Sequence, residues 1–282
     1  MAAELHLHLE GSVPAADLGL EPYQYTGFSG FLQCFKSVVQ CLNTPEDYAR
    51  ITRALLRELG HAGIDYAEVT LSAGVVLWKG QDLRAVFEAI RDASAGANIL
   101  WHMDAVRQFG PSAAMQVARI AAGYAGAGVV SFGIGGDEKT GPAEWFQDVF
   151  RFARDRGLRL TAHAGESDGP GSIWQALEIG AERIGHGIRA IEDAALVSHL
   201  ARHQIPLEVC LTSNVLTGVV ASIEEHPARL LYLEGVPITL NTDDPAIFGT
   251  TLAREFQIAR EGLGFTDAEL EQVASNAYRF RF

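Results

Sequence analysis

The chain has 282 residues, of which 48% are hydrophobic and 20% charged, a composition typical of a globular protein with a large core. Its net charge of −13 excludes the cationic surface that binds a nucleic-acid backbone. The three cysteines form no C-x-x-C pair, and no run of 18 consecutive apolar residues occurs; the charged first residues lead us to expect no signal peptide. We therefore expect a cytoplasmic protein that has no membrane span and no nucleic-acid partner.

Eight short apolar runs alternate with amphipathic helical segments along the chain. The runs that we predict to be strands begin near residues 4, 65, 98, 129, 158, 181, 206 and 237. Several are almost continuously apolar where they begin, which is typical of parallel strands buried on both faces. This α/β alternation predicts a (β/α)8 TIM barrel that forms a single domain over residues 1–282.

Helix signals lie between these runs. Thr44 followed by Pro45 predicts a helix that ends near Gly60. Other predicted helix starts are Gly110–Pro111, Gly141–Pro142, Asp193 and Thr266. In the helix after Gly141–Pro142, we expect Trp145, Val149 and Phe152 to share one face. The first interval between strands is longer than the others and predicts an extra element, a short lid around residues 17–43.

Residues that can carry chemistry or let a ligand approach the main chain follow the predicted strands at their carboxyl ends. They are His6, His8, Gly136, Asp137, Glu138, His163, Glu166, His186, Ser213, Asn214, Asp243 and Asp244. In a (β/α)8 barrel these strand ends meet at one mouth, where active sites are built. We therefore expect these residues, distant in sequence, to form one site.

Three histidines and one aspartate of this set predict a metal site. His6 and His8 are two positions apart on a strand, so their side chains point to the same side. With His163 and Asp243 they make a ligand set that suits one zinc ion and leaves a position open for water, as in catalytic sites. Iron or manganese would also fit these ligands.

Glu166 and His186 are the predicted catalytic residues beside this metal. A carboxyl group in a dry pocket favours its acid form, which suits Glu166 as a general acid. His186 would orient the attacking water and stabilise developing charge. Taken alone, His186 could equally be a core histidine, and Asp243–Asp244 could be the N-cap of a helix.

Six short motifs identify a family resemblance. HLHLEG, GGDE, HAGE, RIGHG, TSN and NTDDP occur in this order, and the set resembles the adenosine deaminase family over essentially the whole chain. The resemblance implies a zinc-dependent hydrolase that deaminates a small-molecule substrate, a 6-aminopurine nucleoside. It implies one zinc ion per chain, bound by His6, His8, His163 and Asp243.

The resemblance also implies roles at the purine. Glu166 would protonate N1, while His186 and Asp243 would steer the water that attacks C6, and ammonia would leave. Asp244 would bind N7 and the main chain of Gly136 would hold N3. Glu10 lies in the region that contacts the sugar, where nucleoside enzymes usually carry Asp.

Alternatives to this function remain open at the level of sequence. The nucleoside would be adenosine or 6-amino-6-deoxyfutalosine, and adenine itself is a further candidate, although adenine-specific relatives usually carry Asp where this chain has Gly185. A binuclear amidohydrolase would need a bridging lysine, and Lys139 is more typical of a solvated loop residue. A binding protein that kept the fold is the third alternative, but the complete set of polar residues argues against it.

Overall fold

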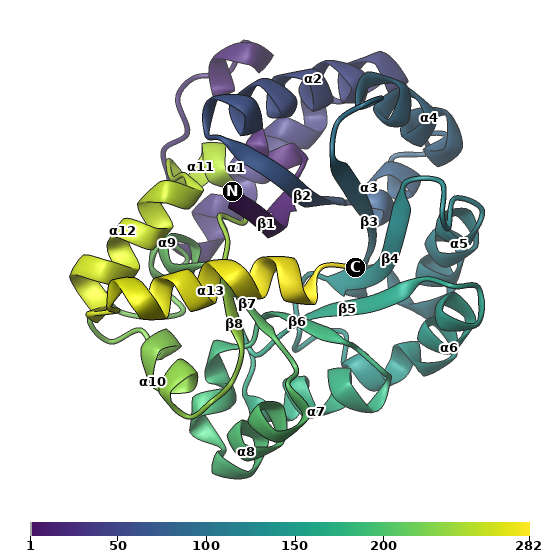
Figure 1. Cartoon of the computed structure of the whole chain (residues 1–282). Helices are drawn as coiled ribbons and strands as arrows, with labels where there is room; N and C mark the ends of the chain where they lie inside the picture. The colour runs from purple at the N-terminus through teal and green to yellow at the C-terminus, as the bar shows by residue number, and fades with distance from the viewer. Residues whose placement is uncertain (1) are drawn as a thin grey trace.

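The computed structural model describes residues 2–282 and shows eight parallel strands, hydrogen-bonded in chain order around a barrel (Figure 1). The strands are β1 (Ala2–His8), β2 (Ile64–Leu71), β3 (Ile99–Val106), β4 (Val129–Gly135), β5 (Arg159–Ala164), β6 (Arg183–His186), β7 (Leu207–Val209) and β8 (Ile238–Leu240). The barrel closes where Asp243, just after β8, forms a parallel bridge with Leu7 of β1. The predicted (β/α)8 fold is confirmed.

Helices surround the strands on the outside of the barrel (Figure 1). The longer ones are α1 (Gly27–Cys41), α2 (Pro45–His61), α4 (Leu83–Ala93), α5 (Gly110–Ala122), α6 (Gln147–Asp155), α7 (Pro170–Glu178), α8 (Ala194–His203), α12 (Leu252–Leu263) and α13 (Asp267–Phe280). The shorter ones are α3 (Ala73–Trp78), α9 (Leu211–Leu216), α10 (Ala228–Leu233) and α11 (Pro245–Phe248). None of them, within residues 2–282, has the length and apolar character needed to cross a bilayer.

The helix ends follow the capping signals of the sequence. Thr44 and Asp47 form a reciprocal capping box at the start of α2, and Thr266 begins α13 in the same way. The carboxylate of Asp193 accepts hydrogen bonds from two main-chain N–H groups of α8. These bonds satisfy the main-chain N–H groups that a helix leaves unpaired at its first turn. The capping residues therefore predict closely where α2, α8 and α13 begin.

Two local predictions are wrong. We expected Ser213 and Asn214 at the carboxyl end of the seventh strand, but β7 ends at Val209 and helix α9 carries both residues. We also expected Trp145 to share a face with Val149, whereas Trp145 is 55% exposed and Val149 is buried. A short 3₁₀ turn over Ala143–Phe146 precedes α6, and its tighter winding changes which residues face the core.

The lid segment predicted around residues 17–43 contains α1. Phe31 of α1 stacks on Phe248 of α11, with ring centroids 4.9 Å apart. Because α11 begins directly after Asp244, this contact places α1 beside the carboxyl end of β8. Closure of this segment over a substrate stays a prediction.

At the opposite end of the barrel, the chain's last residues lie against buried charged side chains. In Figure 1 the C-terminus lies near the middle of the ring of strands. The Phe282 N–H donates to Glu68, which is fully buried, and the Arg183 guanidinium lies 3.8 Å from the centre of the Phe282 ring. Arg183 also pairs with Glu68 and with Glu208, at 2.6 Å each. This floor fills the barrel below the predicted site.

Candidate active site

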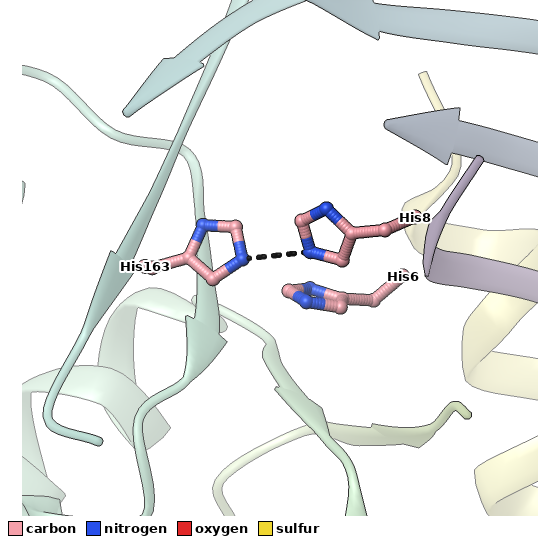
Figure 2. A group of neighbouring side chains, drawn as sticks. All are labelled: His6, His8 and His163. Carbon is pink, nitrogen blue, oxygen red and sulfur yellow. Dashed lines mark hydrogen bonds between the residues drawn. The ribbon is translucent and has the colours of Figure 1, made fainter. Parts of the chain in front are cut away.

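The predicted metal ligands come together at the carboxyl ends of β1, β5 and β8. His6 and His8 project from β1 toward His163 of β5, and Figure 2 shows the three rings facing one another. Nε2 of His8 lies 3.2 Å from Nε2 of His163 and 3.3 Å from Oδ1 of Asp243. Nε2 of His6 lies 3.5 Å from the same Asp243 oxygen. Four side chains from distant parts of the sequence therefore aim ligand atoms at one small volume.

The chemistry of these atoms fits a cation. Nε2 of His6 is buried and has no hydrogen-bond partner among residues 2–282, while its Nδ1 lies 2.7 Å from the carboxylate of Glu208. A histidine that donates one ring N–H to a carboxylate keeps the other nitrogen free to bind a metal. Two groups of three side chains each place their ligand atoms within 4.8 Å of one another. The first group is His6, His8 and His163, and the second is His6, His186 and Asp243. The residues therefore fit a divalent metal ion.

The proton affinities of the ligands agree with this arrangement. Burial lowers the pKa of His8 to about 4 and, with the neighbouring histidines, lowers the pKa of His163 well below its ordinary value. Burial alone would lower the pKa of His6 too, but Asp243 and Glu208 outweigh it and raise this pKa to about 10. Two imidazoles are thus neutral and ready to bind, while a proton on His6 must leave when a metal binds.

Asp243 and Asp244 differ in their surroundings. Burial alone would raise the pKa of Asp243, but the nearby imidazoles of His6, His8 and His186 hold it well below its ordinary value. Ser213 also donates a hydrogen bond of 2.7 Å to Asp243. For Asp244, burial and the charge of Asp243 raise the pKa well above its ordinary value, and its Oδ1 is buried with no partner among residues 2–282. One carboxylate suits a cation, and the other is free to bond a ligand.

The backbone at the site is strained at two positions. His186 and Asp243 have φ angles of 59° and 64°, in the left-handed region that side chains with a Cβ rarely adopt. Such conformations cost on the order of 1–3 kcal/mol each and persist where the surrounding structure requires them. This geometry turns both side chains at the strand ends, where Nε2 of His186 lies 3.9 Å from Oδ2 of Asp243.

Glu166 lies beside His186. Its Oε1 is 3.8 Å from Nε2 of His186, and burial raises the pKa of Glu166. The loop that carries Glu166 is held by Glu138, whose carboxylate accepts hydrogen bonds from the N–H groups of Gly165, Glu166 and Ser167 at 2.7, 3.0 and 2.8 Å. The position of Glu138 after β4 could be predicted from the sequence, but its hold on this loop could not.

The two remaining predicted substrate residues lie at the same end of the barrel. Gly136 has a φ of 97°, and the Gln108 side chain occupies the place where a Cβ of residue 136 would lie. Glu10 is buried just after β1, and its Oε1 accepts a 3.1 Å hydrogen bond from the Ser72 N–H. Its other oxygen, Oε2, has no partner within the described residues, and burial raises the pKa of Glu10 to about 7.

Several residues that support the site escaped sequence reasoning. They are Glu68, Arg107, Arg183, Glu208 and His226, and all are buried. A charged residue inside an apolar strand is unusual and would have pointed to Glu68 and Glu208. Nothing in the sequence indicated the partners, because they lie far apart along the chain.

Lys139, the candidate bridging lysine, and His102 of β3 both lie outside the cluster. His102 bonds to Ser131 and to Glu68 at the floor, as a structural histidine does. Lys139 is exposed in the loop after β4, which leaves the cluster without the bridging lysine that a binuclear site needs.

Comparison with known proteins agrees with this geometry. The family model for adenosine deaminase matches residues 20–282. The chain belongs to the adenosine deaminase family. It is 38% identical to the aminodeoxyfutalosine deaminase of Streptomyces avermitilis, over 98% of this chain and 80% of that protein. It is 37% identical to the adenine deaminase of Agrobacterium fabrum, over 100% of this chain and 94% of that one.

Solved structures show the same fold. An adenine deaminase from Arthrobacter aurescens aligns with a TM-score of 0.90 and 29% identity, over 100% of this chain and 93% of that chain. An amidohydrolase from Burkholderia ambifaria, solved with bound zinc, aligns with a TM-score of 0.89 and 25% identity, over 99% and 85% of the two chains. As a member of the adenosine deaminase family, the protein is a hydrolase that acts on the carbon–nitrogen bond of an amidine.

Proposed function

We propose that this adenosine deaminase family member hydrolyses the 6-amino group of a purine nucleoside, which gives the 6-oxopurine and ammonia. The observation that carries the proposal is the juxtaposition of two groups. A buried carboxyl group with a raised pKa, Glu166, lies next to the cluster of His6, His8, His163 and Asp243. This reaction needs both a proton donor for the ring and an activated water.

One zinc ion would be held by His6, His8, His163 and Asp243. When bound, such an ion lowers the pKa of water toward neutrality and so makes hydroxide available. Three nitrogens and one carboxylate oxygen form a set that zinc accepts with a position left open. The zinc-bound Burkholderia ambifaria structure supports this choice of metal.

The chain's own residues act on the purine. Glu166 would donate a proton to N1, which makes C6 more electrophilic. The unpaired Oδ1 of Asp244 would bond N7, with the carboxyl group supplying the proton that its raised pKa retains. The main chain of Gly136 would hold N3, and the free Oε2 of Glu10 would accept a bond from a sugar hydroxyl. His186 would orient the attacking oxygen.

The unpaired oxygen of Glu10 favours a nucleoside over a free base. Glu10 is buried just after β1, and its Oε2 has no partner within the described residues. A sugar hydroxyl attached to the purine would satisfy this oxygen, whereas free adenine carries no such group. We place adenosine and 6-amino-6-deoxyfutalosine first among the candidates.

Adenine is the second candidate. The relatives that are adenine deaminases match this chain as fully as the aminodeoxyfutalosine deaminase does, at 37% against 38% identity. Gly185 argues against adenine, because adenine-specific relatives usually carry Asp at this position. In this chain a Cβ at residue 185 would lie 2.9 Å from Cε1 of His6. A side chain at residue 185 would therefore require the ring of His6 to move.

A substrate panel tests the proposal. The zinc-loaded protein is mixed with adenosine, 6-amino-6-deoxyfutalosine and adenine in parallel, and loss of the adenine absorption band and ammonia release are followed. We expect one nucleoside to turn over fastest. Adenine turning over fastest would establish the second candidate, and no ammonia from any of the three, with metal bound, would refute the proposal.

A matched pair of variants tests the role of the acid. Glu166→Gln should abolish turnover and keep the metal. Asp168→Asn alters a carboxylate on the same loop whose side chain bonds the N–H of Gly169, and it should keep turnover. Near-normal rates in Glu166→Gln would contradict the assignment of the proton donor.

A further inference from the structure

A chain of buried hydrogen bonds runs from the main chain of α10 to His186. The Ala228 N–H lies 3.2 Å from Nδ1 of His226, and Nε2 of His226 lies 3.1 Å from Oδ1 of Asn214. Nδ2 of Asn214 then lies 3.1 Å from Nδ1 of His186. The exposed fractions of His226, Asn214 and His186 are 3%, 0% and 1%, so no bulk water competes for these bonds.

The first bond determines which nitrogen of His226 carries the proton. A main-chain N–H can only donate, so Nδ1 of His226 must accept from Ala228. Burial lowers the pKa of His226 to about 3, so this ring is neutral at physiological pH. A neutral imidazole has one N–H and one lone pair. The proton of His226 therefore lies on Nε2, which donates to Asn214.

The donor on His226 determines how the amide of Asn214 is oriented. Its oxygen accepts from His226, so its NH₂ group must be the end that faces His186. Nδ1 of His186 is thus an acceptor and carries no proton. The remaining nitrogen of His186, Nε2, must carry one.

The surroundings of Nε2 agree independently with this conclusion. It faces Oε1 of Glu166 at 3.8 Å and Oδ2 of Asp243 at 3.9 Å. A ring N–H is attracted by the carboxylate of Asp243, whereas a lone pair on Nε2 would be repelled by it. Both ends of the His186 ring therefore favour the same position for its proton.

We infer that His226 and Asn214 are positioning residues that fix His186 as the neutral tautomer protonated at Nε2, with Ala228 N–H as the origin of the chain of bonds. His186 then presents a hydrogen-bond donor to the reaction and has no free lone pair on that side. It orients the attacking oxygen and stabilises negative charge on it, and it is not the base that deprotonates water. The inference rests on the proposed function for this consequence alone, since the tautomer itself is a property of the protein without substrate.

Heteronuclear NMR of the ring nitrogens tests the tautomer directly and needs no substrate. The chain contains nine histidines, and the signals of His186 are assigned as those lost in His186→Gln. We expect an unprotonated Nδ1 and a protonated Nε2 in both the metal-free and the zinc-loaded protein. A protonated Nδ1 in the wild-type chain would overturn the inference, and this outcome differs from a failure of the substrate panel.

Asn214→Asp replaces the hydrogen-bond donor that faces His186 with an acceptor. A carboxylate cannot donate to His186, so we expect Nδ1 of His186 to gain a proton and kcat to fall at least about tenfold with a smaller change in KM. Asn276→Asp is the control, because Asn276 is equally buried and donates to the main-chain oxygen of Ile238. It should leave both the NMR signals and kcat as they are. Equal effects of the two variants would reduce Asn214 to a structural residue.

Variants of His226 distinguish the effect of its hydrogen bond from the effect of its size. Gln at residue 226 can donate an N–H to Asn214, so His226→Gln should keep the His186 tautomer and most of kcat. His226→Phe fills the space without a donor, and we expect mixed tautomers and a loss in kcat. Full activity in His226→Phe, with an unchanged His186 tautomer, would show that His226 does not position His186.

Discussion

Glu138→Gln is expected to weaken both the fold and the catalytic loop. The two carboxylate oxygens divide their partners: Oε2 accepts from the N–H of Gly165 and from Ser172, and Oε1 accepts from the N–H groups of Glu166 and Ser167. An amide keeps one oxygen and turns its NH₂ toward donors on the other side. About two bonds are lost, which at roughly 1–2 kcal/mol each gives about 2–4 kcal/mol.

This loss is measurable by calorimetry and kinetics. With an unfolding entropy of about 2 cal/mol/K per residue, a chain of 282 residues should lose roughly 3–7 °C of Tm. We expect kcat to fall about tenfold or more, because Glu166 no longer has a fixed main chain. Glu182→Gln is the control. Glu182 accepts a 3.2 Å bond from the N–H of Leu160 at the other end of β5, where it is partly exposed.

The comparison between these two variants decides the role of Glu138. Glu182→Gln should change Tm by about 2 °C or less and leave kcat unchanged, because a bond at the surface contributes little. If Glu138→Gln keeps the wild-type Tm and kcat, the carboxylate does not hold the loop. If both variants lose kcat equally, the effect is not specific to the mouth.

Three further predictions concern substrate contact, metal and pH. In Gly11→Ala the new Cβ would lie 1.7 Å from Oδ1 of Asp244, so that carboxyl group must move and kcat/KM should fall about 100-fold; wild-type steady-state kinetics would contradict this. Chelation of the metal should lower the free energy of unfolding by about 4 kcal/mol, relative to zinc at about 1,000 times its Kd, and urea titrations that coincide with and without zinc would argue against a bound ion. The folded pKa of His226, about 3, lies below its ordinary value of 6.5, so its stabilising contribution is present above pH 6.5 and is lost as pH falls toward 3. Urea unfolding of the metal-free protein should follow this, with a weaker acid dependence in His226→Phe; equal slopes for both chains would contradict it.

The barrel, and the meeting of the candidate ligands at one end of it, could be predicted from the sequence because both depend on local pattern. Apolar runs recur at the interval of one β/α unit, and polar residues follow them where parallel strands end. His6 and His8 share a side because alternate residues of a strand do. The juxtaposition of His6, His8, His163 and Asp243 thus follows from their strand positions together with the fold.

The supporting residues could not be predicted in the same way, because their roles depend on contacts between distant segments. Glu208 is 202 residues from His6 along the chain, and Glu138 is 28 from Glu166. Sequence gives the chemistry of such groups but not their partners. Asn214 is the clearest case, since we expected it at the end of a strand, and it lies instead on α9, where its amide bonds His186.

The packed lower end of the barrel bears on how molecules reach the cluster. Among residues 2–282, Phe282, Arg183 and Glu68 pack together at the lower end, whereas the histidine cluster lies at the carboxyl ends of the strands. We therefore expect an aminopurine to enter, and the oxopurine and ammonia to leave, through the mouth. Because substrate and oxopurine would then share one opening and one binding site, we expect the product to inhibit competitively.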